Sequence, residues 1–260
     1  MTDWLWSTAV YAAAMIALAG AVGVIRPFRR LYGKSRLRAL MMLVAGVAIA
    51  IGITMSTPSA TSSGERHGID EFAPVFHFRE QHSTVIAAPP ERVFAAIRTV
   101  TADEIALFNL FTGIRRFGRP GPESILNAPG RHPILDVAVG TGFHLLADRA
   151  PHEVVIGSVV VAPPRTGPPF DSAQGTRRQF TAEDFRALAQ PGFAKATMNF
   201  RVADLGNGSS RVDTETRVFA TDGAALGRFT PYWRIIFPGS SILRSTWLSA
   251  IKRRAERPAF

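Results

Sequence analysis

The chain has 260 residues, of which 47% are hydrophobic, carries a formal net charge of +10 and contains no cysteine. This length allows one or two domains, and the lack of cysteine excludes disulfides, thiolate catalysis and Cys-based zinc or iron–sulfur sites. The basic residues cluster between two apolar runs and at the C-terminus, without interleaved aromatic residues, so nucleic acid is not an expected partner.

The first fifth of the chain contains two uncharged apolar runs, residues 4–25 and 39–55. A helix of about 20 apolar residues crosses the hydrocarbon core of a bilayer, and the second run is near the lower limit. Trp4 and Trp6 lie toward one end of the first run, where amphipathic rings favour the membrane interface. Residues 1–55 are therefore predicted to form a transmembrane helical hairpin, with a buried soluble helix as the alternative.

Six basic residues separate these two runs, and positively charged loops stay in the cytoplasm. This rule predicts a multi-pass protein of the cell membrane, with loop 26–38 cytoplasmic and the C-terminal domain extracytoplasmic. Asp3 and the lack of a basic residue beside it argue against a cleaved signal peptide. Residues 56–69 are small and polar and are predicted to be a flexible linker, so that a globular domain occupies residues 70–260.

A predicted strand, residues 76–87, opens the globular domain, and two prolines then precede a helix over residues 91–97. Thr101 or Asp103 can cap a second short helix that follows directly. The stretch 118–133 is rich in glycine and proline and must be a loop.

Three strands are predicted next, at residues 134–139, 143–149 and 153–161, with short turns between them. The first turn, Gly140-Thr141-Gly142, resembles the glycine-rich first motif of S-adenosylmethionine-dependent methyltransferases. Such a cofactor site needs a helix after the glycines, for which the chain leaves too little room before Pro151. A hairpin turn is therefore the better interpretation.

The stretch 162–179 contains four prolines and is predicted to be a loop or an irregular edge strand. Thr181 then caps a short helix, with Asp184 three residues further on. The clearest hairpin pairs residues 193–204 with 211–220. Its apolar alternation selects the cross-strand pairs Val202–Val212, Phe200–Thr214, Met198–Thr216 and Arg201–Asp213. A slip of one residue would instead turn the polar positions of the second strand inward.

The segment from Asp222 to Arg254 has the pattern of one long helix that lays an apolar stripe on a large apolar surface. Pro238-Gly239 interrupts this segment and is predicted to kink or split the helix, at the mouth of a cavity. The stripe consists of Leu226, Phe229, Trp233, Ile236, Ser240, Leu243, Trp247 and Ala250.

This order of elements, opened by HSTVIAAPPERVFAAI (residues 82–97), resembles the START/SRPBCC helix-grip superfamily, which includes the birch-pollen-allergen type. The resemblance covers about residues 75–255. It implies an α+β fold in which a curved antiparallel sheet of about seven strands grips the C-terminal helix around an apolar cavity. Members bind lipids, sterols, polyketides or hormones, and a few catalyse reactions. The two membrane helices and the proline in the long helix depart from the simplest members, and no catalytic residue carries over.

The expected cavity lies between the sheet and the long helix, with a mostly apolar lining. The expected lining residues are Met198, Phe200, Thr214, Thr216, Phe229, Trp233, Phe143 and Leu145. Glu215, Arg217 and His144 are possible polar anchors for a ligand, although Glu215 and Arg217 also fit an exposed strand face. The six histidines lack the HExxH spacing, and neither a metal nor another cofactor is predicted.

Three functions remain open at this stage. The leading hypothesis is a membrane-anchored binding or carrier module for a hydrophobic small molecule or lipid, since such ligands concentrate in bilayers. An enzyme of the cyclase, hydrolase or lyase type needs an inward ionisable side chain, for which Glu215, Arg217, His144 and Asp148 are the candidates. The third is a structural or partner-binding membrane protein whose cavity is filled by its own side chains.

Overall fold

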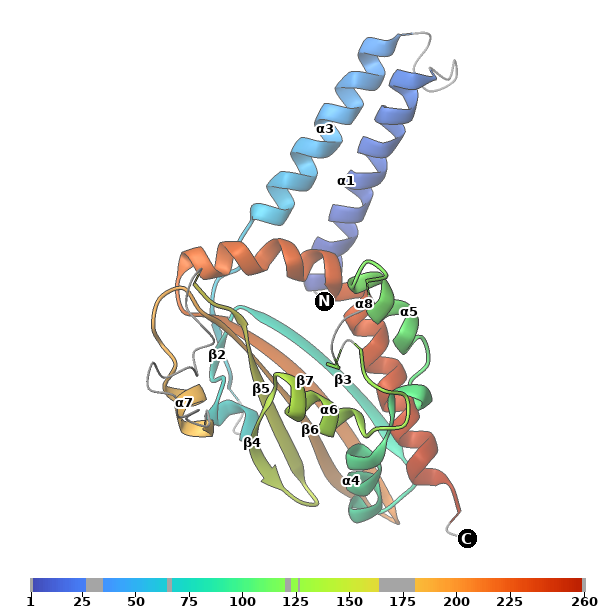
Figure 1. Ribbon diagram of the computed structural model, residues 1–260, viewed down its shortest axis with the longest axis vertical. Coiled ribbons are helices and arrows are strands. Elements are labelled where there is room, and N and C mark those ends of the chain that lie inside the picture. Colours follow the sequence, from blue (N-terminus) through green and yellow to red (C-terminus); the bar gives the residue numbers. More distant parts are fainter. Residues whose placement is uncertain are drawn as a thin grey trace. The chain divides into compact units, whose positions relative to one another are not determined.

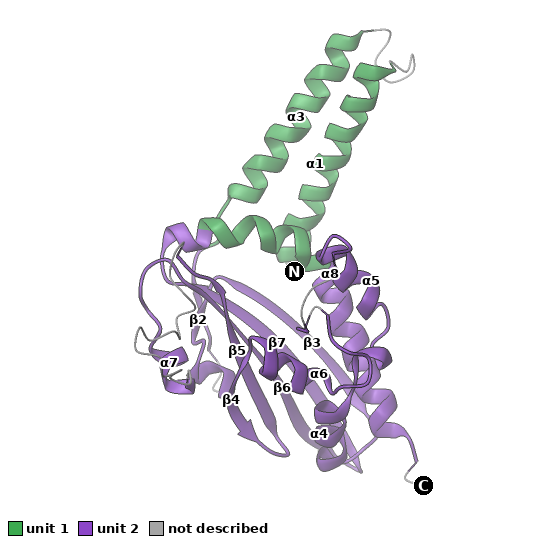
Figure 2. Cartoon of the chain, viewed as in Figure 1, with its two compact units in different colours: residues 1–58, 227–238 green, residues 59–226, 239–260 purple. Residues whose placement is uncertain are grey.

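The computed structural model describes residues 2–26, 35–64, 67–119, 123–125, 127–163 and 181–258. The chain forms two compact units that share one long helix, α8 (Gly223–Glu256) (Figure 2). Unit 1 contains Met1–Pro58 and Gly227–Pro238, and unit 2 contains Ser59–Leu226 and Gly239–Phe260.

Unit 1 contains the two apolar helices α1 (Thr2–Ile25) and α3 (Arg36–Met55), which lie side by side (Figure 1). Both helices are long and apolar enough to cross a membrane, as predicted. The two helices approach closely at Gly20, where an added Cβ atom would lie only 2.3 Å from the backbone nitrogen of Leu43. The lack of a side chain at Gly20 allows this approach. Small residues at such contacts are typical of helices that associate within a bilayer. Most of the basic loop between them lies outside the described residues.

The segment of α8 in unit 1 packs on the start of α1. The ring of Phe237 contacts that of Trp4 edge-on, at 5.6 Å between centroids. The guanidinium of Arg234 is buried, forms an ion pair with Asp3 at 3.1 Å and lies 4.8 Å from the ring centre of Trp6. Aromatic rings and this ion pair therefore join the N-terminus of the chain to its last helix.

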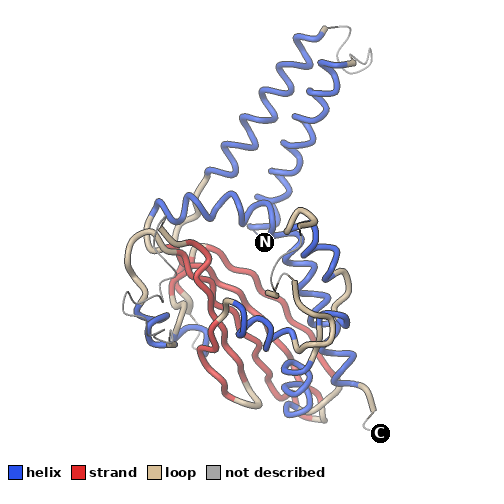
Figure 3. The backbone as a smooth tube through the Cα atoms, viewed as in Figure 1, coloured by secondary structure: helices blue, strands red, loops and turns tan. Residues whose placement is uncertain are grey.

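Unit 2 is an α+β structure built on one five-stranded sheet, antiparallel throughout, in the order β3-β7-β6-β5-β4 (Figure 3). Its strands are β3 (Phe78–Ile86), β4 (His144–Arg149), β5 (Glu153–Val161), β6 (Ala194–Gly206) and β7 (Ser209–Ala220). The last strand closes against the first, so the sheet is finished immediately before α8 begins. The prediction of about seven strands was too high for the main sheet, because two further strands, β1 (Thr61–Ser62) and β2 (Val75–Phe76), form a separate ribbon.

Short helices connect these strands. They are η1 (Gly68–Glu71), α4 (Pro90–Thr99), η2 (Ala102–Glu104), α5 (Phe108–Arg115), α6 (Ile134–Thr141) and α7 (Ala182–Ala187). The predicted caps are present, since Thr101 and Thr181 each form a capping box with the acidic residue three positions on. The side chain of Asp222 likewise accepts a hydrogen bond from the Ala225 amide at the start of α8.

The strand predicted at residues 134–139 is wrong, because this stretch forms α6. Its buried residues Ile134, Leu135, Val137 and Ala138 lie on one helical face, which suits a helix lying on the core better than a strand with one hydrated face. Gly140-Thr141-Gly142 therefore ends a helix, with Gly142 at a φ of 145°, and does not form the predicted hairpin turn.

The β6–β7 register is confirmed at every predicted pair, from Val202↔Val212 to Met198↔Thr216. The turn contains two residues, Asn207 and Gly208, both with positive φ, which is the backbone that favours Asn-Gly in a hairpin. A β-bulge between Asp204 and Gly206 lets this tight turn keep the register that apolar pairing selects.

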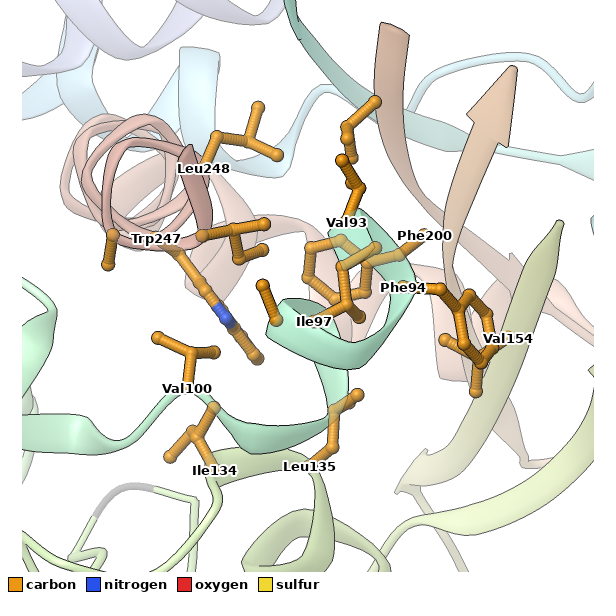
Figure 4. Close-up of a cluster of buried hydrophobic side chains, with 14 of the residues drawn as sticks. Val93, Phe94, Ile97, Val100, Ile134, Leu135, Val154, Phe200, Trp247 and Leu248 are labelled. Atoms are coloured by element: carbon orange, nitrogen blue, oxygen red, sulfur yellow. The ribbon is translucent and has the colours of Figure 1, made fainter. Parts of the chain in front are cut away.

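One face of the sheet carries the main apolar core (Figure 4). Phe200 and Met198 of β6 contribute to it together with Val93 and Ile97 of α4. Trp247 from the second half of α8 lies 5.1 Å from the Phe200 ring, so α8 packs on the sheet as the resemblance implies. The helix is continuous through Pro231 and Pro238, so of the two outcomes predicted at Pro238-Gly239, a kink or a split, the split does not occur.

A second layer covers the opposite face of the sheet. Phe185 of α7 and Phe72, just after η1, pack there against Leu146 and Val155. The Gly68 amide also donates to the buried Glu153 carboxylate of β5, at 3.0 Å. The end of the stretch predicted as a flexible linker thus belongs to unit 2 and is hydrogen-bonded to its sheet.

Candidate functional site

The core-facing side of β3 carries two ionisable residues. Phe78 and Ile86 are buried, and strand alternation therefore directs Glu80 and His82, which lie between them, toward α8. The register agrees, because Glu80 pairs with Thr216 and His82 pairs with Thr214 of β7. A carboxylate and an imidazole thus lie on the sheet face that carries the main apolar core.

These two side chains meet serines of α8. Glu80 accepts a hydrogen bond from Ser240 at 2.9 Å, and its other oxygen lies 3.0 Å from His82 Nε2. His82 Nε2 is also 3.3 Å from Ser241 Oγ, and its Nδ1 is 3.3 Å from Ser245 Oγ. The cluster extends from the buried Glu80 to the exposed Ser245, so one end is open to solvent.

Arg244 adds a cation to this cluster. Its Nη2 donates to Thr216 Oγ1 at 2.7 Å, while Nη1 is fully buried and has no acceptor within the described ranges. Burial lowers the pKa of the Arg244 guanidinium, and the negative charge of Glu80 acts in the opposite direction. Arg244 therefore keeps one donor free for an acceptor that those ranges do not supply.

Trp247 lies one helical turn further along α8, with its ring centre 5.5 Å from the Arg244 guanidinium. Its side chain reaches from α8 toward Val100 and Ile134 (Figure 4). The indole Nε1 is buried and, over the residues that the structure describes, meets no acceptor. Leaving such a donor unpaired costs about 1–3 kcal/mol, so it too favours an acceptor from outside the chain.

Together these residues form a site with two buried donors, one carboxylate, one imidazole and an apolar floor. The donors suit an acidic or carbonyl-bearing group, and the floor suits an aliphatic or aromatic body. Within the described residues no group of three or more His, Asp or Glu side chains is arranged to hold a metal ion.

Four of the predicted lining residues lie at or beside this site. Met198 and Phe200 are fully buried in the main core, and Thr216 binds Arg244. Thr214 lies on the same face but donates its hydroxyl proton to the Asn199 carbonyl at 2.7 Å, which occupies its donor. The hairpin register thus places these four residues on one face of β6 and β7.

The other four lie elsewhere. Phe143 packs at the margin of the main core, and Leu145 on the edge strand β4 is 42% exposed. Phe229 and Trp233 belong to unit 1, where their rings pack against each other at 6.0 Å.

Glu215 and Arg217 lie neither on the helix side nor in solvent. Both are buried on the opposite face, where Arg217 donates to Glu215 at 2.6 Å, to Asp70 at 2.5 Å and to the Ala73 carbonyl at 2.9 Å. Its guanidinium also lies 4.9 Å from the Phe76 ring centre. The alternative of an exposed strand face fails because the second layer covers these positions. Their contacts give them a structural role there.

The remaining polar candidates also lie outside the cluster. His144 pairs with Gly157, on the face that α7 covers, and burial lowers the pKa of its imidazole. Asp148 is partly exposed and forms an ion pair with Arg98 of α4. The inward ionisable residues are instead Glu80, His82 and Arg244.

Sequence reasoning missed these three residues, although two patterns indicated them. Phe78 and Ile86 are spaced by an even number in β3, which places Glu80 and His82 on their face. Ser240 is the polar member of an otherwise apolar stripe, and Arg244 lies one turn beyond it. A polar residue on an apolar stripe calls for a polar partner across the interface.

Comparisons with known proteins bear on the fold alone. No protein-family model matches the chain, and no curated protein matches it. Among solved structures it is similar to a hypothetical protein from Helicobacter pylori, with 8% identity and a TM-score of 0.35, over 75% of this chain and 98% of that one. It is also similar to the Zhui aromatase/cyclase from Streptomyces sp. R1128, with 13% identity and a TM-score of 0.27, over 69% and 94%. At these values the assignment of a helix-grip arrangement rests on the chain's own order of elements, an antiparallel sheet closed by a long C-terminal helix.

Proposed function

We propose that this chain is a membrane-anchored module that binds an amphipathic small molecule, such as a lipid, between its sheet and the second half of α8. The observation that carries the proposal is a pair of buried donors next to an apolar floor, Arg244 Nη1 and Trp247 Nε1, neither of which meets an acceptor within the described residues. Arg244 would hold an acidic or carbonyl group of the ligand, and the region around Phe200 and Trp247 would hold its apolar part.

The test compares ligands that remain bound to the full chain after purification in mild detergent. Mass spectrometry should find an amphipathic molecule in the wild type, and Arg244→Gln should reduce its occupancy at least about tenfold, since a charged hydrogen bond contributes about 1.5–3 kcal/mol. Arg253→Gln is the matched control, because Arg253 is an exposed arginine of the same helix. A wild type that carries no such molecule and does not bind cis-parinaric acid would contradict the proposal.

A second candidate is ester hydrolysis at the open end of the same cluster. His82 lies between Glu80 and Ser245, an arrangement in which an imidazole can accept the serine proton while a carboxylate stabilises the imidazolium. Ser245 Oγ would attack the ester carbonyl and pass its proton through His82 Nδ1 to the leaving alcohol. Water would then hydrolyse the acyl-serine.

A fluorophosphonate probe tests this second candidate independently. The probe should modify the wild type and Ser249→Ala but not Ser245→Ala or His82→Ala, because only Ser245 lies beside the imidazole base. Ser249 is the control since it is exposed on the same helix and donates to the Ser245 carbonyl. An unmodified wild type would remove the hydrolase candidate and leave the binding proposal standing.

The membrane arrangement is part of the proposal. The cluster of basic residues between α1 and α3 supports a cytoplasmic loop, with the C-terminal domain on the other side of the membrane. A reporter fused after Phe260 tests this orientation. Cytoplasmic-type activity of the reporter would contradict it.

A further inference from the structure

The helix α5 in unit 2 presents an apolar stripe to solvent. Leu107, Leu110, Ile114 and Phe117 are spaced by three, four and three residues, which places them on one face of the helix and its flanking turns. Their exposed fractions are 49%, 55%, 62% and 89%. Four large apolar side chains on one face, each at least about half exposed, form a surface for a partner.

The opposite face of α5 is anchored. Phe108 is buried in the main core, and Thr112 is buried with its hydroxyl bonded to the Phe108 carbonyl. Phe111 lies next to Gly239, where an added Cβ would be 3.3 Å from its ring. The stripe is therefore held outward by a rigid attachment, next to the part of α8 that begins the Glu80–Arg244 cluster.

Phe117 is held in a backbone conformation that favours glycine or asparagine. Its φ is 54°, and its amide donates to the Ile114 carbonyl at 2.9 Å. A bulky residue in this region costs about 1 kcal/mol or more. Because the Phe117 side chain is almost fully exposed, contacts of its ring within the fold do not offset this cost.

Three arginines at the C-terminal end of α5 and in the turn that follows it form a basic border to the stripe. The stretch from residue 105 to residue 122 contains Arg115, Arg116 and Arg119 and no acidic residue. Over the described ranges neither Arg116 nor Arg119 forms an ion pair. An apolar helical face beside arginines is the pattern of helices that lie in the interface of an anionic bilayer.

The tether also favours a bilayer as the partner. Five residues separate the end of α3 at Met55 from β1 at Thr61. Five residues span at most about 18 Å, so a membrane that holds α3 is always near unit 2. We infer that the stripe formed by Leu107, Leu110, Ile114 and Phe117 docks in the interface of an anionic lipid bilayer. This inference rests on the membrane anchor of the proposed function, but not on its ligand or on catalysis.

The chain contains no cysteine, so Ile114→Cys introduces a single labelling site. The full chain carrying an NBD label there is placed, one copy per nanodisc, in phosphatidylcholine with phosphatidylglycerol. Doxyl lipids should quench this label at least about twofold more than a label at Leu205→Cys, an exposed apolar position at the tip of the β6–β7 hairpin.

A second set of variants tests the basic border. Adding Arg115→Gln and Arg119→Gln to the labelled chain should weaken the quenching several-fold, and phosphatidylcholine alone should do the same. Equal quenching at Ile114 and Leu205, with equal access to aqueous iodide, would overturn the inference. Label self-quenching that appears only with two copies per nanodisc, without doxyl quenching, would also overturn it by identifying a second chain as the partner.

Discussion

The two faces of the five-stranded sheet are buried in different ways. The face toward α8 is covered by apolar side chains of α4, α6 and α8, and its ionisable residues Glu80 and His82 lie in one cluster with the serines of α8. The opposite face carries Arg217, Glu215 and Glu153. The chain from η1 to β2 forms hydrogen bonds with Arg217 and Glu153, and Glu215 pairs with Arg217 and Arg79. Alternation in a strand therefore predicts which residues share a face, but it does not predict which other elements cover that face.

The two faces should also respond differently when a buried side chain is removed. Apolar contacts on the α8 face are non-directional, so a loss of volume leaves a cavity and the remaining residues relax toward it. Each charge on the opposite face has a defined partner, so removing one member leaves another charge buried without compensation. Substitutions on the two faces should therefore differ in how much they lower the free energy of unfolding. They should also differ in whether this change depends on a partner residue and on pH.

The largest effect is expected for Arg217→Leu. This guanidinium is only 1% exposed and pairs with Glu215 and Asp70, so its loss should lower the free energy of unfolding by about 3–5 kcal/mol. Urea titration of the full chain in detergent, followed by tryptophan fluorescence, measures the change. Arg79→Leu is the control, because Arg79 binds the same Glu215 oxygen at 2.6 Å but is 43% exposed, and it should cost less than about 1 kcal/mol. Equal costs for the two variants would contradict the role given to burial.

On the α8 face, Phe200→Ala should cost about 3 kcal/mol, near the low end for such a truncation, because the apolar core can relax into the space left by the ring. The contact with Trp247 at 5.1 Å is lost with it. The same urea titration measures the change, and Val85→Ala, at an exposed position of β3, should have little effect. A cost for Phe200→Ala below about 1 kcal/mol would mean that this face is not the main core.

Some features of the two faces follow from the sequence, and others depend on contacts between distant segments. The β6–β7 register follows from alternation alone, since a slip would have placed Phe200 and Met198 on the wrong face. The strand predicted at residues 134–139 failed because a short, continuously apolar run has the same composition in a buried helix as in a strand. The role of Arg217 could not be predicted, because its partner Asp70 lies 147 residues away, at the predicted start of the globular domain.

The candidate site shows the same limit. Thr216 and Ser240 were each identified, one on a strand and one on the helix stripe, but the two long-range contacts that define the site were not. Glu80 meets Ser240 across 160 residues, and Arg244 meets Thr216 only when α8 lies on the sheet. Local patterns predict faces, whereas sites between elements depend on how the faces are brought together.

A smaller effect is expected for Gly157→Ala on the face that α7 covers. The added Cβ would lie 2.6 Å from the Phe185 ring and 2.7 Å from a methyl carbon of Leu146, so the small side-chain cluster there must shift. Such overpacking should cost about 1–3 kcal/mol in urea titration. Gly140→Ala is the control, because nothing lies within 4 Å of its added Cβ, and in helix α6 it should stabilise by up to about 1 kcal/mol. A neutral Gly157→Ala would show that α7 packs loosely on this face.

The smallest expected effect is the change in the free energy of unfolding at acid pH, which should arise on the charged face and not on the apolar face. Burial by itself raises the pKa of Asp70, but hydrogen bonds from Arg217, the His67 amide and Ser63, together with the charge of Arg217, outweigh it, so the folded pKa lies below the usual 3.8. A carboxyl with a lowered folded pKa stabilises the fold above its unfolded pKa, and the contribution is lost as the pH falls through the folded value.

The free energy of unfolding of the wild type should therefore fall as the pH decreases from about 4 to about 2, and Asp70→Asn should remove part of this slope. At neutral pH Asp70→Asn should already be less stable than the wild type, because the amide cannot replace the charge that faces Arg217. Phe200→Ala should keep the full acid slope, since the apolar face holds no part of that ion pair. Urea titrations at a series of pH values measure all three chains. If Phe200→Ala lost the slope as strongly as Asp70→Asn, the acid response would belong to the whole fold rather than to the charged face.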